Sequence, residues 1–97
     1  MIDASVAIQV LPSVADRDVI RVVDKVIAYI KSTGLKTFVG PFETTVEGGF
    51  DELMELVKRC QLICIEEGAP GVLSYVKIHY KPGGGIWTID EKTAKHQ

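Results

Sequence analysis

Acidic and hydroxyl side chains alternate along one short segment near the middle of the chain, GPFETTVEGGF, at residues 40–50. In an extended strand, Glu43, Thr45 and Glu47 would project from the same side. Carboxylates accept hydrogen bonds and pair with cations, and a threonine hydroxyl both donates and accepts. The spacing therefore predicts a polar recognition site on one face of a sheet, which neighbouring strands must complete.

Several extended segments are predicted elsewhere in the chain. They are rich in β-branched and aromatic residues, and Pro or Gly bounds most of them. The predicted strands are residues 5–11, 35–39, 42–47 and 72–80, with a short edge strand at Ile86 to Ile89. The polar tail, residues 90–97, is expected to fray.

Two other segments have the period of an amphipathic helix. The first runs from Asp16 to Gly34, with apolar residues at spacings of three and four. The second runs from Phe50 to Glu67, and Gly68 ends it. The resulting order, βαββαβ, is typical of an α+β ferredoxin-like sandwich, in which two helices cover one face of a four-stranded antiparallel sheet. We expect one such domain over residues 1–97.

Strand alternation separates the sheet into a core face and a face without a helix, which we call the open face. The expected core side chains are Val6, Ile8, Val10, Phe42, Thr44, Val46, Val72, Val76 and Ile78. The expected open-face side chains are Ser5, Ala7, Gln9, Leu11, Glu43, Thr45, Glu47, Leu73, Tyr75, Lys77 and His79. The first and third strands are central in this fold, so Gln9, Thr45 and Glu47 are expected to be neighbours.

The open face has two interpretations. It can be an ordinary solvated face on which Glu43, Glu47 and Lys77 form cross-strand charge pairs. It also mixes small residues, an aromatic ring and convergent polar groups, which is typical of small-molecule sites. We favour the second interpretation, because the cluster of threonines, glutamates and glycines is denser than a solvated strand needs.

The composition argues against nucleic-acid and membrane partners. The formal net charge is -2, and the lysines and arginines are scattered, so no basic surface is predicted. The N-terminal apolar run follows no basic segment and is too short for a signal core or a membrane span. We therefore expect a cytoplasmic protein whose two cysteines are reduced thiols.

Other residues that could do chemistry have simpler explanations. Cys60 and Cys64 share a helix face and could begin a metal site, but no further ligand is near them in sequence, so core packing is expected. His79 and His96 are isolated histidines. The run Gly83 to Gly85 lacks the strand-turn-helix setting of a phosphate loop and is expected to form a turn.

Four segments resemble those of a known family. DASVAIQVLP at the start, GPFETTVEG in the middle, EEGAP before the last long strand and TIDEK near the end are similar to the small prokaryotic thiamine-binding proteins. The resemblance covers nearly the whole chain. It implies a ferredoxin-like fold, homodimers or tetramers assembled through the sheets, and binding of thiamine or its hydroxymethylpyrimidine portion, with no other cofactor.

The chemistry of thiamine then gives each candidate residue a role. Glu47 can accept from the aminopyrimidine or pair with the thiazolium, and Lys77 can neutralise a glutamate or meet a phosphate. Hydroxyl and amide groups can bond the ring edge, and aromatic rings can stack on the ligand. The predicted ligand-binding residues are Ser5, Gln9, Phe42, Thr44, Thr45, Glu47, Tyr75, Lys77 and Trp87.

Two other functions are compatible with the same residues. An ACT-like regulatory or assembly module would bind another small molecule or a protein partner through the open face. An enzyme of thiamine metabolism would need a base or nucleophile with an evident partner, and only Glu43, Glu47 and His79 compete for that role. We expect no catalytic residue and no metal site.

Overall fold

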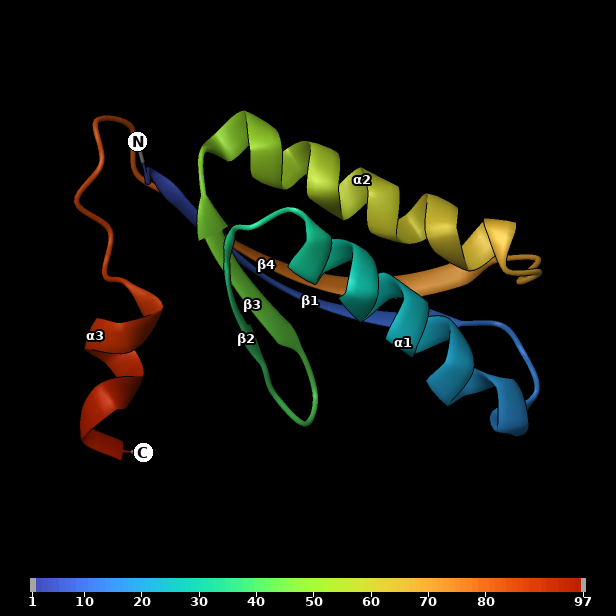
Figure 1. Ribbon diagram of the computed structural model, residues 1–97. Coiled ribbons are helices and arrows are strands. Elements are labelled where there is room, and N and C mark those ends of the chain that lie inside the picture. The colour runs from blue at the N-terminus through green and yellow to red at the C-terminus, as the bar shows by residue number, and fades with distance from the viewer. Residues whose placement is uncertain (1, 97) are drawn as a thin grey trace.

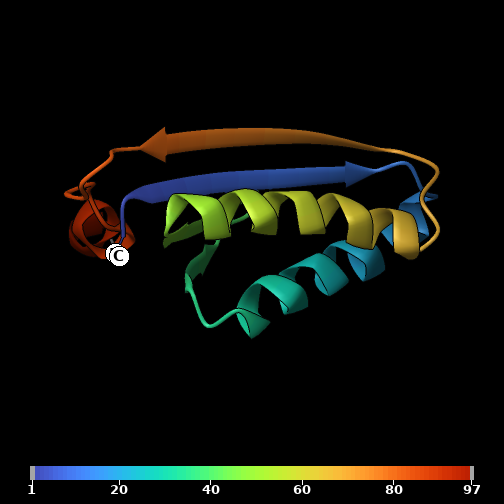
Figure 2. The ribbon, with the colours of Figure 1, turned by 90° about the horizontal axis from the view of Figure 1, so that it is seen from above.

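The structure is a computed structural model that describes residues 2–96 and arranges them in two main layers (Figure 1). The elements are β1 (Ala4–Pro12), α1 (Asp16–Ser32), β2 (Lys36–Val39), β3 (Thr44–Gly48), α2 (Phe50–Glu66), β4 (Val72–Tyr80), α3 (Ile89–Thr93) and a 3-10 turn at Ala94–His96. The strands form one antiparallel sheet, and α1 and α2 lie on the same side of it (Figure 2). The predicted α+β ferredoxin-like fold is confirmed.

The strand order β2-β3-β1-β4 places β1 and β3 at the centre of the sheet, as the sequence predicts. The register aligns open-face residues in rows across the strands. One row contains Phe38, Thr45, Ala7 and Lys77, in the order of the strands. The next row contains Lys36, Glu47, Ser5 and His79. Distant parts of the chain therefore meet on this face.

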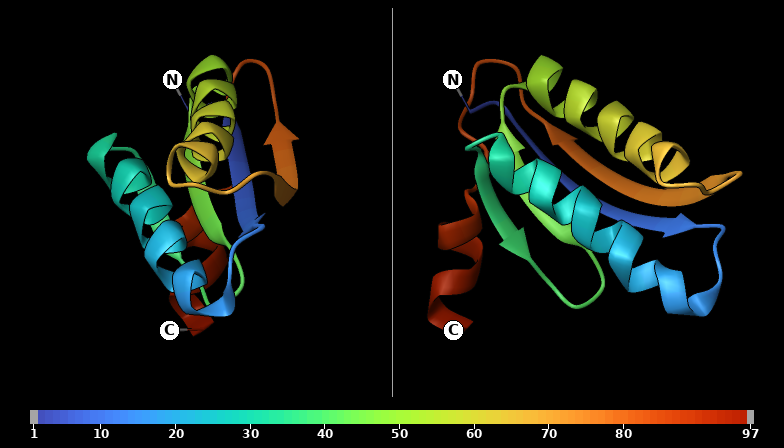
Figure 3. Two further views of the ribbon diagram at one scale, coloured as in Figure 1. Left: turned by 90° about the vertical axis from the view of Figure 1, so that its right-hand side faces the viewer. Right: turned by 45° about the vertical axis from the view of Figure 1, so that its right-hand side comes forward.

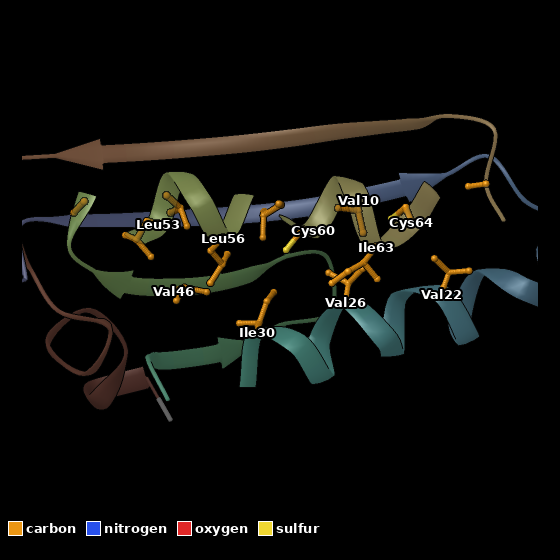
Figure 4. Close-up of a cluster of buried hydrophobic side chains, with 14 residues drawn as sticks. Val10, Val22, Val26, Ile30, Val46, Leu53, Leu56, Cys60, Ile63 and Cys64 are labelled. Carbon is orange, nitrogen blue, oxygen red and sulfur yellow. The ribbon is translucent and has the colours of Figure 1, made fainter. Parts of the chain in front are cut away.

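The core forms between the other face of the sheet and the two long helices (Figure 4). Val22, Val26 and Ile30 recur every fourth residue along α1, so they form one buried stripe against the sheet. The buried side of α2 supplies Leu53, Leu56, Cys60, Ile63 and Cys64, and the strands supply Ala4, Val6, Ile8, Val10 and Val46. The predicted packing of both cysteines in the core is confirmed.

The prediction that Phe42 faces the helices from within the third strand is wrong. Strand β3 begins at Thr44, and Phe42 is 79% exposed. The backbone amide of Gly40 donates to the carbonyl of Glu43 at 2.9 Å, which closes the segment between them into a turn. Pro41 lies inside this turn, so the extended conformation starts only after it.

The prediction that Ile78 is a core residue is also wrong. It lies on the helix side of β4, as the alternation requires, but it remains 50% exposed. Strand β4 is the edge of the sheet and pairs only with β1 among the described strands (Figure 3). An edge position leaves one flank of its side chains without a covering element.

No strand forms at residues 86–89, and the tail is not uniformly frayed. Residues 86–88 are irregular, α3 begins at Ile89, and the chain continues in a 3-10 turn to His96. Residue 97 lies outside the described part of the chain. The side chains of Ile86 and Ile89 are buried, so tertiary packing holds a segment that was expected to pair as a strand.

Truncating the core should destabilise the protein strongly. Leu53 is fully buried between α2 and the sheet, so Leu53→Ala is expected to lower the free energy of unfolding by about 2 to 5 kcal/mol. Leu62 lies on the same helix and is 41% exposed, so Leu62→Ala is the matched control, with an expected loss of about 0.5 kcal/mol or less. Urea denaturation measures both, and equal losses would contradict this packing.

Candidate functional site

A cavity of about 300 Å³ opens on the sheet face turned away from α1 and α2. Its floor contains Ser5 and Ala7 of β1 and Thr45 of β3. These are small side chains on the two central strands, so they leave space above the sheet. Ser5 is almost completely buried, while Thr45 is partly exposed. The floor thus offers two hydroxyl groups beside a methyl group.

Charged and aromatic side chains surround this floor. The Lys77 Nζ atom lies 3.0 Å from Glu43 Oε2, an ion pair that spans the sheet from β4 to the start of β3. Phe38 of β2 lines the opposite flank, and His79 lines the cavity two residues beyond Lys77. The expected cross-strand pairing of a glutamate with Lys77 is therefore present, with Glu43 as the acid. Both charges remain partly exposed, so solvent screens their attraction.

Helix α3 closes one end of the cavity through Ile89, Lys92 and Thr93. In Figure 1, β2 and β3 pass between α3 on the left and α1 on the right. The expectation that no helix covers the open face is therefore wrong at this end. The site therefore combines residues that are distant in sequence: Thr45 of β3 and Ile89 of α3 line the same cavity although more than forty positions separate them.

One buried hydrogen bond attaches α3 to the sheet. The backbone amide of Ile89 donates to Glu47 Oε2 at 2.9 Å, and Glu47 is only 6% exposed. The carboxylate lies at the first turn of α3, where the helix has unsatisfied amide groups. A second, exposed contact joins Lys36 Nζ to Asp90 Oδ2 at 3.3 Å. Glu47 thus fixes the position of the cavity wall.

The chain reaches α3 through a turn and a local cap. Gly83, Gly84 and Gly85 all have positive φ, a conformation that other residues adopt at a cost. At the start of α3, the Thr88 hydroxyl accepts from the Glu91 amide at 3.1 Å, and the Glu91 carboxylate accepts from the Thr88 amide at 3.0 Å. This capping box explains why so short a helix begins at Ile89.

The structure separates the predicted ligand-binding residues into groups. Ser5, Thr45 and Lys77 line the open-face cavity. Gln9, Phe42 and Thr44 line a second cavity of about 210 Å³ between β1, α1 and the turn after β2. Glu47, Tyr75 and Trp87 line neither cavity, and Tyr75 and Trp87 are exposed.

Sequence reasoning missed Phe38 and the three α3 residues in the cavity wall. Phe38 follows from alternation once β2 is paired with β3, because it lies opposite Thr45. The signal for α3 was the T-x-x-E pattern formed by Thr88 and Glu91, which predicts a helix start rather than a strand. Glu43 and His79 were expected on the open face, and both line the cavity.

The cysteines do not contribute to this site. Burial, together with the nearby Cys64, raises the pKa of the Cys60 thiol to about 12. Burial also raises the pKa of Cys64. Both therefore stay as protonated thiols, which are poor nucleophiles and poor metal ligands. Within residues 2–96, no three His, Cys, Asp or Glu side chains gather as a metal site would require.

The described helices also include none that is both long enough and apolar enough to cross a membrane. The fold and the site together define a ferredoxin-like α+β domain with a small cavity between the open face of its sheet and a C-terminal helix. The sequence model of the thiamine-binding protein family matches residues 6–97, and the chain belongs to this family.

Known proteins with similar sequences and structures agree with this assignment. A UPF0045 protein of Clostridium perfringens is 58% identical over 93 residues, which is 96% of each chain. A domain of unknown function from Bacillus cereus has a TM-score of 0.87 at 41% identity, over 98% of this chain and 90% of that one. A candidate thiamine biosynthesis or salvage protein of Thermotoga maritima has a TM-score of 0.83 at 40% identity, over 98% of this chain and 99% of that one.

Removing the Glu47 carboxylate should loosen α3. In Glu47→Ala the buried Ile89 amide loses its acceptor, which costs roughly 1 to 3 kcal/mol and favours opening of the helix. Amide hydrogen exchange at Ile89 is expected to become about tenfold faster or more. Glu47→Gln keeps an acceptor oxygen and should retain most of the protection. Unchanged exchange in Glu47→Ala would contradict this role.

Proposed function

We propose that the protein binds thiamine or its hydroxymethylpyrimidine portion in the open-face cavity, without catalysing a reaction on it. The observation that carries this proposal is the cavity itself, which lies on the open sheet face of a member of the thiamine-binding protein family. Its volume of about 300 Å³ is at the lower end of the range for small-molecule sites. A single heteroaromatic ring with its substituents suits a site of this size.

The lining groups match the functional groups of an aminopyrimidine. This ring has an exocyclic amino group that donates and ring nitrogens that accept. In our proposal the Glu43 carboxylate accepts from the amino group, and the Thr45 hydroxyl bonds a ring nitrogen. Phe38 contacts a ring through its apolar face. Because thiamine and hydroxymethylpyrimidine share this ring, both fit the same contacts.

Glu47 has a different part in this proposal from the one that the sequence suggests. Its carboxylate accepts from the Ile89 amide, so it supports α3 rather than lining the cavity. Direct contact between Glu47 and a ligand stays a prediction. Glu43 takes the role of ligand acceptor, since its side chain lines the cavity and can exchange Lys77 for a ligand amine.

The proposed role is binding rather than turnover, in the cytoplasm. Nucleophilic catalysis by Ser5 would need a base that activates its hydroxyl, and within the described residues no hydrogen bond joins Ser5 to His79, its paired residue on β4. Thiamine incubated with the protein should therefore be recovered unchanged.

We also infer that a second copy of the chain covers the rest of the open face, as a dimer or as half of a tetramer. Beyond the cavity, Leu11, Leu73 and Tyr75 are exposed large side chains on neighbouring strands. Contiguous exposed apolar side chains of this kind are typical of protein interfaces. A second subunit placed there would lie close to the cavity and could complete its open side.

Charge removal at Glu43 tests the ligand site. Glu43→Gln is expected to weaken the binding of thiamine and of hydroxymethylpyrimidine by about ten- to hundredfold, because a charge-assisted hydrogen bond becomes a neutral one. Isothermal titration calorimetry measures the affinities. Glu55→Gln on α2 is the control, since Glu55 lines neither cavity, and it should bind as the parent does. Equal affinity in Glu43→Gln would remove Glu43 from the site.

A charge at the exposed patch tests the proposed assembly. Tyr75→Glu places a carboxylate where the second subunit would pack, so the protein is expected to dissociate to monomers at micromolar concentration. Sedimentation velocity measures the change in mass. Ile20→Glu on α1 adds the same charge at another exposed apolar residue and should leave the assembly intact. A monomeric parent protein would disprove the interface.

A further inference from the structure

We propose that the α3 end of the open-face cavity is a phosphate subsite, so that the protein prefers the phosphomonoester of its ligand to the free alcohol. This proposal rests on the proposed function and adds the chemical form of the ligand. The subsite is formed by Lys92, His79 and Ser5, which line the same cavity from α3, β4 and β1. Each can donate a hydrogen bond to a phosphate oxygen.

Basic side chains outnumber acidic ones in the lining of the cavity. Three of the lining side chains can carry positive charge, namely Lys77, His79 and Lys92, and one, Glu43, can carry negative charge. The Glu43 carboxylate already pairs with Lys77 at 3.0 Å. Within the described chain, no acidic group forms an ion pair with Lys92 or His79. The cavity therefore retains uncompensated positive charge, and a phosphate would neutralise it.

The three subsite residues lie close to one another in the fold. Ser5 and His79 are directly opposite in the antiparallel pairing of β1 and β4, and both side chains point to the open face. Side chains in such a pair are about 5 Å apart at their Cβ atoms. Lys92 lines the same cavity from α3, the helix that Glu47, the β3 partner of Ser5, attaches to the sheet. Three donors thus converge from three elements.

The nearby acidic groups are already occupied. Glu47 lies beside Ser5 in the sheet, but its carboxylate is buried against the start of α3 and does not line the cavity. Asp90 pairs with Lys36 outside the cavity lining. The Thr93 hydroxyl donates to the carbonyl of Ile89 at 2.8 Å. Its proton is therefore already used within α3, and Thr93 forms part of the wall without donating to a ligand. Lys92 is therefore the charged side chain at the α3 end of the cavity that is available to bind a phosphate.

The cavity is also polarised along its length, which fixes the orientation of a ligand. Glu43 lies four residues before Glu47 in the chain, so their Cα atoms are separated by at most roughly 13 Å, and Glu47 attaches α3, the helix that carries Lys92. An aminopyrimidine at Glu43 and a phosphate at Lys92 would place the donor group of the ligand at one end and its negative charge at the other. Thiamine without phosphate would instead bring its cationic thiazolium toward Lys92, which weakens binding.

Calorimetric titrations with thiamine, thiamine monophosphate, hydroxymethylpyrimidine and its phosphate ester test this inference on the full chain. Thiamine monophosphate is expected to bind about ten- to hundredfold more tightly than thiamine, whereas hydroxymethylpyrimidine phosphate, whose amino and phosphate groups are on adjacent ring carbons, cannot span both ends and is expected to gain less. Lys92→Gln should reduce this ratio to about threefold or less. Lys95→Gln, on the 3-10 turn outside the cavity lining, is the matched control and should keep the full ratio. Thermal unfolding verifies that both variants are folded.

The outcomes separate the two proposals. Equal affinities for ester and alcohol, or a ratio that survives in Lys92→Gln, would overturn the phosphate subsite while leaving ligand binding in place. If all four compounds fail to bind, the proposed function fails, and phenyl phosphate then serves as the probe in an NMR titration. Shifts of the His79 ring signals that disappear in Lys92→Gln would still support the subsite, and the absence of shifts would overturn it.

Discussion

Strand β1 is the constraint on which the rest of the structure depends. It pairs with β3 on one edge and with β4 on the other, and its Val6, Ile8 and Val10 side chains are buried under the helices. A shift of one residue in either pairing would turn these side chains toward the opposite face. Burial of one face therefore also fixes Ser5 and Ala7 on the other, which is why the cavity floor is small and polar.

Much of this arrangement could be predicted from the sequence because alternation and helical periodicity are local. The runs of valine and isoleucine in β1 and α1 identify the core face, and the opposite face follows by geometry. Ser5, Thr45 and Lys77 were located in this way, and the structure brings them together in one cavity. Exposure was less predictable: Ile78 has the correct orientation, but its burial depends on β4 being an edge strand.

The part that could not be predicted depends on contacts between distant segments. Residues 86–89 have the composition of a short strand, yet their conformation is set by the capping box and by the hydrogen bond from Ile89 to Glu47. From the sequence alone, the Glu47 carboxylate is predicted to contact a ligand, because the amide that it binds, that of Ile89, is 42 positions away along the chain. The assignment of Glu43 and Glu47 to different tasks therefore required the tertiary structure.

The glycine turn before α3 restricts substitution through backbone conformation rather than through contacts. An added Cβ at Gly83 would touch nothing within 4 Å, so the position tolerates substitution on steric grounds. Its φ of 90°, followed by 85° and 86° at Gly84 and Gly85, is nevertheless strained for any residue with a side chain. The position of the cavity wall thus depends on three residues outside the cavity lining, whose contribution is the backbone conformation that brings the chain to α3.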